Sequence, residues 1–360
     1  MAGLFGTTTT SSSTTASTSG DISKDAPISN PPEDGISDLS FSSAADFLAV
    51  ASWDKKTRIY EIDGNGQSQG KAMIEHEGPV LSCAWSKDGT KIASAGADKA
   101  VRMLDLAANT GKAQQVAAHD EPIRSIRFVD VQGQAMLVSG GWDKKVKYWD
   151  LRQSTPVATL DCQERVYTMD SKDNLLVIGT ADRYINIVNL TQPGTFYKTM
   201  QSPLKWQTRV VSCFTDATGF AVGSIEGRCA IQYVEDKDSS SNFSFKCHRE
   251  QASAPSRDTQ VYSVNAISFH PVHGTFSTAG SDGTFHFWDK DAKHRLKGYP
   301  PVGGPISCTA FNRTGTIFAY GVSYDWSKGY SANNPQTPNK IMLHPVNQEE
   351  IKPRQVAKKR

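Results

Sequence analysis

Short apolar stretches recur along almost the whole chain beyond residue 35, and they come in groups of three. One group is "VLSCAWS" at residues 80–86, "KIASAG" at 91–96 and "VRMLDL" at 101–106, with polar turn residues between them. Stretches of this length that are rich in β-branched and aromatic side chains are typical of strands, and short turns join them into antiparallel meanders. The pattern therefore predicts an all-β protein.

A second repeat marks the turn between the second and third stretch of each group. Small residues followed by an acid occur seven times, and the successive acids are separated by 44, 45, 39, 44, 56 and 43 residues. A period near 40–45 residues is typical of propellers built from WD repeats, with one four-stranded blade per repeat. We therefore expect a seven-bladed WD-repeat β-propeller. The seven acids are Asp54, Asp98, Asp143, Asp182, Glu226, Asp282 and Asp325.

These acids are expected to be structural, together with two histidines. A short carboxylate in a tight turn can accept hydrogen bonds from backbone N–H groups and fix the turn. His76 and His119 come just before the first strands of the second and third blades, where they can hydrogen-bond an acid of the repeat. Seven acids spread around a ring cannot converge on one substrate, so they are poor candidates for a hydrolase triad. We expect no catalytic residues.

The N-terminal part of the chain differs in composition from the repeats. Residues 1–35 contain a run of Ser and Thr at 7–19 and the apolar tetrapeptide "GLFG" at 3–6. Such a segment has little to bury, so we expect a disordered tail. The propeller is expected to span residues 36–354, and a basic tail follows at 355–360.

A ring of blades also requires that the last blade be completed, because an open edge invites pairing with other chains. The stretch "KIMLHPV", which starts at residue 340, supplies the third strand of the seventh blade. Part of the segment 24–31 is expected to supply the outer strand. The C-terminal "EEIKPRQVAKKR" is the alternative donor.

Composition excludes several classes of protein. The formal net charge is only +2 over 360 residues, so a charged site must come from local clustering. No stretch approaches the roughly 18 apolar residues of a membrane span. The six cysteines are widely spread, which favours buried free thiols in a reducing compartment over a disulfide framework. Neither a metal-ligand cluster nor a phosphate-binding loop is present, so we expect no metal and no cofactor.

Local clustering of bases does occur in the turns that carry the acids. Six of the seven turns have a Lys or Arg within three residues of the acid. Because all of these turns open on one rim of a propeller, that rim is expected to be basic and to attract a Glu-rich peptide or a nucleic acid. The bases are Lys55, Lys56, Lys99, Lys144, Lys145, Arg183, Arg228 and Lys328. Aromatic residues on the same rim are Trp53, Trp142, Tyr262 and Trp326, of which Tyr262 and Trp326 are the better candidates for contact.

A second basic patch is expected on the side of the fifth and sixth blades. The segments "NFSFKCHRE" at 242–250 and "DKDAKHRLKG" at 289–298 combine bases with phenylalanines. Stacking on aromatic rings together with phosphate contacts suits single-stranded nucleic acid. One of the two phenylalanines is expected to pack into the core. The candidate RNA-binding residues are Phe245, Lys246, Arg249, Lys290, Lys293, Arg295 and Lys297.

Several long strings in this chain also resemble one known family. They include "GFAVGSIEGRCAIQY" at 219–233, "FHPVHGTFSTAGSDGTFHFWDKDAK" at 269–293 and "IFAYGVSYDWSKG" at 317–329. They are similar to the nuclear mRNA export propellers, the poly(A) RNA export factors that associate with the nuclear pore. The resemblance covers nearly all of residues 36–354. The "GLFG" tetrapeptide also resembles the cohesive repeat of pore proteins.

The resemblance implies a non-enzymatic adaptor in the nucleus, at the nuclear pore complex, that shuttles to the cytoplasm. The family binds the GLEBS motif, a glutamate-bearing segment of a GLFG-repeat nucleoporin, across one propeller face. Arg228 would pair with a carboxylate of that segment, and Arg209 would join the partner-binding rim. The side patch would then face mRNA or a ribonucleoprotein. The alternative is a spindle-checkpoint adaptor that binds similar motifs of checkpoint kinases, because a related propeller shares the "GSIEGR" type of motif.

Overall fold

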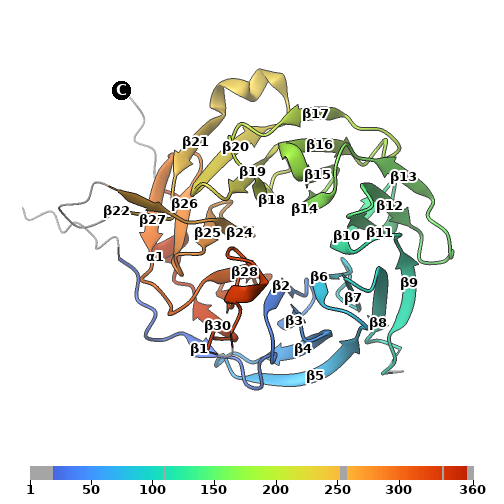
Figure 1. The fold of residues 1–360 in the computed structure, drawn as a ribbon, viewed down its shortest axis with the longest axis horizontal. Helices are drawn as coiled ribbons and strands as arrows, with labels where there is room; N and C mark the ends of the chain where they lie inside the picture. The colour runs from blue at the N-terminus through green and yellow to red at the C-terminus, as the bar shows by residue number, and fades with distance from the viewer. Residues whose placement is uncertain (1–18, 109–110, 252–257, 335, 355–360) are drawn as a thin grey trace, which may run out of the picture.

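Seven four-stranded sheets arranged as a ring form the protein (Figure 1). The computed structural model describes residues 19–108, 111–251, 258–334 and 336–354. In blades 1 to 6 the chain runs from an innermost strand at the central channel to an outer strand, and neighbouring strands pair antiparallel, as in blade 2. The expected seven-bladed propeller is confirmed.

The strands of the first four blades follow one another directly in the sequence. Blade 1 contains β2 (Ile36–Phe41), β3 (Phe47–Ser52), β4 (Lys56–Ile62) and β5 (Ser68–Glu75). Blade 2 contains β6 (Val80–Trp85), β7 (Lys91–Gly96), β8 (Ala100–Asp105) and β9 (Gln114–Ala118). Blade 3 contains β10 (Ile123–Val131), β11 (Gln134–Gly141), β12 (Lys145–Trp149) and β13 (Ala158–Asp161). Blade 4 contains β14 (Val166–Lys172), β15 (Leu175–Thr180), β16 (Tyr184–Asn189) and β17 (Lys198–Gln201).

The remaining blades include one insertion and one strand from the other end of the chain. Blade 5 contains β18 (Thr208–Cys213), β19 (Gly219–Ser224), β20 (Arg228–Tyr233) and β21 (Phe243–Lys246). The hairpin of β22 (Arg249–Gln251) and β23 (Thr259–Val261) follows. Blade 6 contains β24 (Val264–Phe269), β25 (Phe276–Gly280), β26 (Phe285–Asp289) and β27 (His294–Gly298). Blade 7 contains β28 (Ile306–Phe311), β29 (Ile317–Val322), β30 (Lys340–Pro345) and β1 (Ala26–Pro27).

Within the described ranges, helical structure is confined to short segments. They are η1 (Ala181–Arg183), η2 (Asp236–Ser241), η3 (Tyr330–Ala332) and α1 (Gln348–Ile351). No helix within the described residues is long and apolar enough to cross a membrane.

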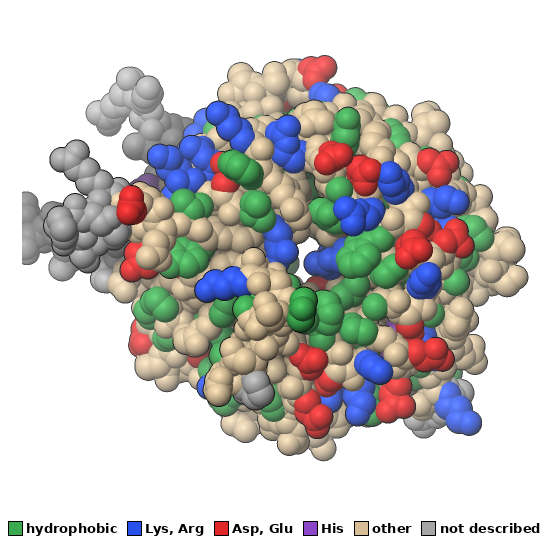
Figure 2. Space-filling model, in the orientation of Figure 1, with side chains coloured by type: hydrophobic (Ala, Val, Ile, Leu, Met, Phe, Trp, Pro, Cys, Tyr) green, Lys and Arg blue, Asp and Glu red, His purple; other side chains and the backbone are tan. Residues whose placement is uncertain are grey.

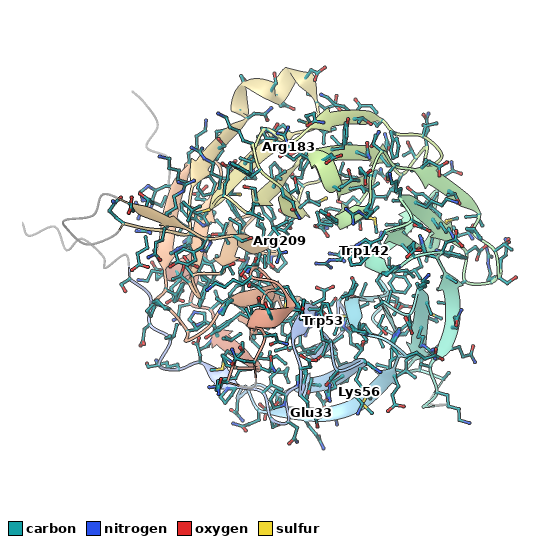
Figure 3. The ribbon with its side chains drawn as sticks, in the orientation of Figure 1. Glu33, Trp53, Lys56, Trp142, Arg183 and Arg209 are labelled. Carbon is teal, nitrogen blue, oxygen red and sulfur yellow. The ribbon has the colours of Figure 1, made fainter. Side chains whose placement is uncertain are left out.

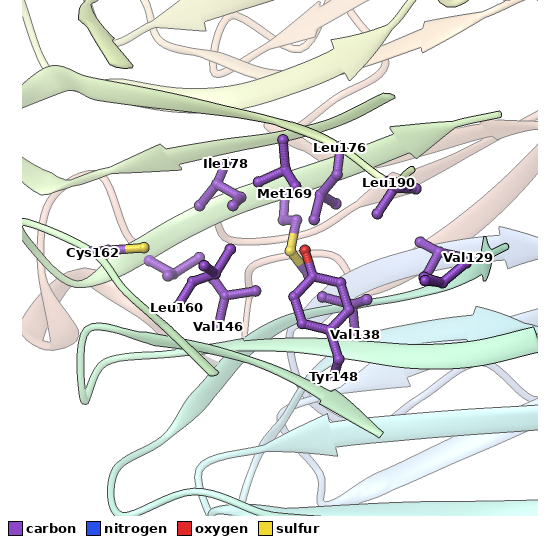
Figure 4. Packing of buried hydrophobic residues seen from close by; sticks show 13 residues of the cluster. Val129, Val138, Val146, Tyr148, Leu160, Cys162, Met169, Leu176, Ile178 and Leu190 are labelled. Atoms are coloured by element: carbon purple, nitrogen blue, oxygen red, sulfur yellow. The ribbon is translucent and has the colours of Figure 1, made fainter. Parts of the chain in front are cut away.

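Hydrophobic packing takes place mainly between neighbouring blades. The cluster in Figure 4 joins blades 3 and 4: Tyr148 and Val138 of blade 3 lie against Met169 and Ile178 of blade 4, and all four are fully buried. The middle strands of these two blades carry continuous apolar runs because both of their faces are covered by an adjacent blade. All six cysteines are free and buried in these layers.

Buried hydrogen-bond networks fix three of the turns that carry acids. In blade 3, His119 Nδ1 lies 2.9 Å from Asp143 Oδ2 and His119 Nε2 lies 2.7 Å from Ser139 Oγ, which also accepts a hydrogen bond from Trp149 Nε1. Burial alone would raise the pKa of the Asp143 carboxyl, but the hydrogen bond and charge of His119 outweigh it and lower the pKa. Asp143 thus stabilises the fold as a carboxylate.

Equivalent networks occur in blades 2 and 6. His76 Nδ1 lies 2.9 Å from Asp98 Oδ2. His248 Nδ1 lies 2.9 Å from Asp282 Oδ1, and its Nε2 lies 2.9 Å from Thr278 Oγ1. The sequence pattern did not single out His248, because the hairpin β22–β23 separates it from Asp282 by 34 positions.

The other four acids have different surroundings. Asp54 forms an ion pair with Arg58 at 2.5 Å, and Glu226 accepts a hydrogen bond from the Lys205 backbone N–H at 3.2 Å. Asp325 is buried and accepts hydrogen bonds from Asn265 and Ser281 of blade 6. Asp182 is exposed. The seven positions are therefore equivalent in the repeat but not in their contacts.

The N-terminal segment completes blade 7. The short strand β1 pairs antiparallel with β30, Ala26 lying opposite Leu343, and Ile28 is buried beside it. Residues 19–35 are therefore not part of a disordered tail, and the expectation of disorder up to residue 35 is wrong for this part. They fold because Ile22 and Ile28 have apolar surfaces of blades 6, 7 and 1 to pack against. The "GLFG" tetrapeptide and the basic tail at 355–360 lie outside the described residues.

Both ends of the chain meet at one buried histidine. His344 Nδ1 lies 2.6 Å from Asp25 Oδ1, and His344 Nε2 lies 3.5 Å from Glu350 Oε2 of α1. Burial would lower the pKa of His344, but the two neighbouring carboxylates of Asp25 and Glu350 outweigh it and raise the pKa to about 9. The C-terminal segment therefore forms a helix that supports the closing strand, while residues 26–27 supply the strand itself.

Candidate partner-binding face

The turns between the second and third strands of each blade all lie on one face of the ring, which we call the turn face. Figures 1, 2 and 3 view the molecule from this side. The residue after the acid has a left-handed backbone in most of these turns, with φ of 70° at Lys55, 65° at Lys99 and 64° at Lys144. Glycine takes this place in blades 5 and 6, at Gly227 and Gly283. This conformation reverses the chain within a few residues and leaves the turn at the surface.

The turn face is not uniformly basic, contrary to the expectation from the sequence. Lys144 Nζ lies 2.7 Å from Glu164 Oε1, and Lys99 Nζ lies 3.7 Å from Glu121 Oε1. Each acid comes from the loop that leads into the following blade, so it neutralises the base of the preceding turn. Figure 2 shows acidic and basic side chains interspersed over this part of the face. The bases of blades 2 and 3 are therefore partly compensated within the chain.

The other bases of the turn face differ in whether their side chains have partners within the protein. The side-chain ammonium groups of Lys55, Lys56, Lys145 and Lys328 have no hydrogen-bond or ion-pair partner within the described part of the chain. Arg183 donates a hydrogen bond to the Leu204 carbonyl at 3.0 Å. Arg209 lies at the edge of the central channel rather than on the rim, where Nη2 lies 3.1 Å from the Asp325 carbonyl (Figure 3).

Aromatic side chains surround the channel opening on the turn face. Trp53 and Trp326 stack with ring centroids 4.1 Å apart, and Trp142 lies across the opening with 39% of its surface exposed (Figure 3). Trp206, on the loop before β18, is 60% exposed. Figure 2 shows hydrophobic side chains gathered beside the opening. We call Trp53, Trp142, Trp206 and Trp326 the tryptophan cluster. Trp206 was not identified from the sequence because it lies in a loop outside the repeat signature.

Arg228 occupies a basic region between blades 5 and 6. It begins β20, lies opposite Lys246 of β21 in the strand register, and its Nε is 3.9 Å from Glu226 Oε2. About a third of its side chain is exposed. Arg249 donates a hydrogen bond to the Glu226 carbonyl at 2.6 Å, so it is fixed close to this strand. Tyr262, at the base of the hairpin, donates a hydrogen bond to Gln260 and is partly exposed.

A groove of about 380 Å³ lies next to this region. We call it the blade 5–6 groove. Bases from three elements converge on it, Lys246 from β21, Arg249 from β22 and Arg295 from β27, and Trp288 forms part of its wall. This convergence comes from segments that are almost 50 positions apart in the sequence.

Two residues of the predicted RNA-binding set, Phe245 and Lys290, are engaged in contacts within the protein. Phe245 packs against Trp288 with ring centroids 4.5 Å apart, and Phe243 also lies against the core of blades 5 and 6. Both phenylalanines pack because residues i and i+2 of a strand share one face, so the expectation that only one of them packs is wrong. Lys290 is only 9% exposed in its side chain and forms an ion pair with Asp291. Phe245 is thus partly buried by packing and the Lys290 ammonium group is paired, so both are weaker candidates for contact with a nucleic acid than the bases of the groove.

The other two lysines of that segment lie outside the groove. Lys293 is exposed and its Nζ lies 4.9 Å from the centre of the Phe243 ring. Lys297 is partly buried on β27, opposite Phe287. The candidate RNA surface is therefore reduced to the three bases that line the groove.

One group of side chains in the groove consists of residue types that can coordinate a metal ion. The ligand atoms of His248, Asp282 and His286 lie within 4.8 Å of one another. Both ring nitrogens of His248 are, however, already engaged by Asp282 and Thr278 in the network that fixes the turn of blade 6. Burial lowers the pKa of His286 to about 3, so this histidine is neutral. The arrangement is accounted for as a structural network.

Comparison with known proteins supports the fold and indicates a family. The WD domain, G-beta repeat, matches residues 28–61, 68–105, 111–150 and 255–289. The chain is 66% identical to the "mRNA export factor GLE2" of Chaetomium thermophilum over 364 residues, covering all of both chains. It is 58% identical to the "Poly(A)+ RNA export protein" of Schizosaccharomyces pombe over 352 residues, covering 98% of each. It is 44% identical to "Protein Rae1" of Drosophila melanogaster, covering 91% of this chain and 95% of the relative.

Proposed function

The chain belongs to the WD40 family of mRNA export factors, and from this premise we propose that it is a non-enzymatic adaptor in mRNA export at the nuclear pore. Its partner would be the GLEBS segment of a GLFG-repeat nucleoporin, bound on the turn face. The protein would then reside in the nucleus and at the nuclear envelope, and shuttle to the cytoplasm. The absence of catalysis is proposed because the His76–Asp98 and His119–Asp143 pairs are buried and fix turns.

The observation that carries this proposal is that the tryptophan cluster and Arg228 lie on the same face of the propeller. Exposed aromatic side chains and an arginine on the same face are the composition of interface hot spots. Trp142 is 39% exposed and Trp206 is 60% exposed, so two large apolar side chains face the solvent on this face. An acidic segment with apolar residues would cover these rings and pair a carboxylate with Arg228, whose fork matches a carboxylate bidentately.

Calorimetric titration of the full chain with a GLEBS segment tests the proposal. We expect saturable one-to-one binding that weakens severalfold when the salt concentration is raised from about 50 to 300 mM, because partly exposed charge pairs are screened. A scrambled segment of the same composition is the control. Equal binding of the scrambled segment, or no binding of the GLEBS segment, would contradict the proposed partner.

We further propose that the blade 5–6 groove faces RNA. Lys246, Arg249 and Arg295 converge there, and phosphate contacts of this kind give binding that falls steeply with salt. For a single-stranded RNA oligonucleotide, the Arg295→Glu variant is expected to bind roughly tenfold more weakly than the wild type. Fluorescence anisotropy measures this, with Arg313→Glu, an exposed base outside the groove, as control. Identical affinity of the two variants would remove the groove from the RNA surface.

A further inference from the structure

A ring of strand irregularities surrounds the central channel near the turn face. In every blade the innermost strand loses its register with the second strand at one residue close to its start, for example between Ile36 and Asp38 in blade 1. The flanking residue Ile36 lies opposite Ser52, the last residue before the turn, so the irregularity lies near the turn face. Such bulges turn a side chain out of the regular pleat. We call the residues at these positions the bulge ring; they are Ser37, Leu81, Arg124, Tyr167, Arg209, Asn265 and Ser307.

Five of these bulge residues line one cavity of about 340 Å³ in the channel. They are Ser37, Arg124, Arg209, Asn265 and Ser307. These five residues bring two guanidinium groups, two hydroxyls and an amide to the cavity, which is also lined by Arg127, Asp38 and Asp170. Figure 2 shows basic side chains at the channel opening, and Figure 3 places Arg209 at its edge.

The acids of the channel are already satisfied by other groups. Asp38 accepts hydrogen bonds from Ser82 Oγ at 2.9 Å and from the Cys83 backbone N–H at 3.1 Å. Asp170 pairs with Arg127 at 3.0 Å and also accepts the Cys213 backbone N–H at 2.8 Å. These acids therefore have their own partners, and one channel arginine, Arg127, is neutralised.

Arg124 and Arg209 lack such compensation. Within the described ranges, no carboxylate oxygen lies within 4.0 Å of either guanidinium group. Arg124 donates from Nη1 to the Leu81 carbonyl at 3.1 Å, and Arg209 donates from Nη2 to Asn265 Oδ1 and the Asp325 carbonyl. Each thus uses one terminal nitrogen, which leaves its other donors for the channel. A guanidinium group carries five N–H donors in a fixed fork.

The electrostatic balance of the channel opening favours an anion. Burial lowers the pKa of Arg124 and of Arg209, although the charge of Asp38 raises the pKa of Arg124 and the charge of Asp325 raises that of Arg209; the charge of Arg209 also lowers the pKa of Arg124. Two desolvated cations that repel each other are costly unless a counter-charge is present. A dianion between them would neutralise both and satisfy their free donors.

We propose that the bulge ring binds a phosphate-class dianion between Arg124 and Arg209. A tetrahedral phosphate offers oxygens in several directions, which suits two guanidinium forks that approach from blades 3 and 5. Ser37 and Ser307 also line the cavity, but their hydroxyls donate to the carbonyls of Val80 and Gly321, so the two guanidinium groups are the donors for the anion. The site is distinct from the blade 5–6 groove and does not depend on the proposed function.

Inorganic pyrophosphate is the probe that tests this site on the full chain. Calorimetric titration at constant ionic strength is expected to show binding to the wild type that is weakened roughly tenfold or more in Arg124→Gln. Arg313→Gln, which removes an exposed base on the opposite face, is expected to bind as the wild type does. Pyrophosphate should also raise the melting temperature of the wild type but not that of Arg124→Gln.

The melting temperature of Arg124→Gln without ligand shows whether Arg124 serves anion binding or stabilises the fold. Without pyrophosphate, Arg124→Gln is expected to melt close to the wild type, since Arg124 is only partly buried and has one hydrogen bond and no ion-pair partner within the described residues. Arg209→Gln serves as the second variant if Arg124→Gln does not fold, with the same loss of pyrophosphate binding expected. Undiminished pyrophosphate binding by a folded variant, or no binding by the wild type, would overturn the proposal. Tighter binding of succinate than of pyrophosphate would overturn the assignment to phosphate.

Discussion

Arg228→Glu is expected to weaken binding of a GLEBS segment by roughly a hundredfold or more while leaving the fold intact. Reversal replaces an attraction to a partner carboxylate with a repulsion, and removing one member of an interfacial charge pair costs about 2–5 kcal/mol of binding free energy. The fold should tolerate the change because Arg228 makes only a 3.9 Å contact with Glu226. The new carboxylate would also lie opposite Lys246, which offsets its repulsion from Glu226.

Calorimetric titration and thermal melting of the same samples check this expectation. The control is Arg313→Glu, which makes the same reversal in the turn between β28 and β29, on the opposite face. Its affinity should equal that of the wild type. If Arg228→Glu lowered the melting temperature by more than about 5 °C, Arg228 would be a structural residue and its assignment to the partner-binding face would be wrong.

Asp143→Ala is expected to have the opposite profile, with a large loss of stability and no direct loss of binding. It removes the acceptor for His119 and for the Lys145 backbone N–H, and leaves His119 buried with one nitrogen unpaired. Hydrogen bonds to charged groups contribute about 1.5–3 kcal/mol each, so a loss of about 3 kcal/mol of unfolding free energy is expected. For a propeller of this size, that corresponds to a melting temperature roughly 4 °C lower.

The repeat offers a matched control for this variant. Asp182 holds the equivalent position in blade 4 but is exposed, and Asp182→Asn retains a side chain that tolerates its φ of 57°. Its melting temperature should stay within about 2 °C of the wild type. Differential scanning calorimetry measures both variants, and affinity is compared well below the transition. A weaker affinity of folded Asp143→Ala would place Asp143 in the binding surface.

The repeat period made the blades predictable from the sequence, because each blade is a local unit of consecutive strands. The spacing of 56 between Glu226 and Asp282 departs from the period because η2 and the hairpin β22–β23 are inserted there. The same insertion separates His248 from Asp282, which is why that pair was not found. A periodic pattern identifies strands reliably but not pairs that an insertion moves apart.

The charge of the turn face could not be predicted in the same way. The sequence places Lys99 and Lys144 in the turns, but their neutralisation by Glu121 and Glu164 depends on how one blade stacks on the next. Likewise, the bulge ring has no sequence signature, since its seven positions carry unrelated residues whose common placement is set by backbone register. Contacts between blades are long-range consequences of closing the ring.

The closure of blade 7 by the N-terminal strand has a consequence for the order of events during synthesis. Residues 26–27 leave the ribosome before their partners at 340–345 have been translated, and at about 5–20 residues per second the interval lasts on the order of tens of seconds. Blades 1 to 6 can form as they emerge, but Asp25 can meet His344 and Glu350 only after these two residues have been translated. Until then, the growing propeller is an open arc with two unprotected edges, a state in which chaperones would be most needed.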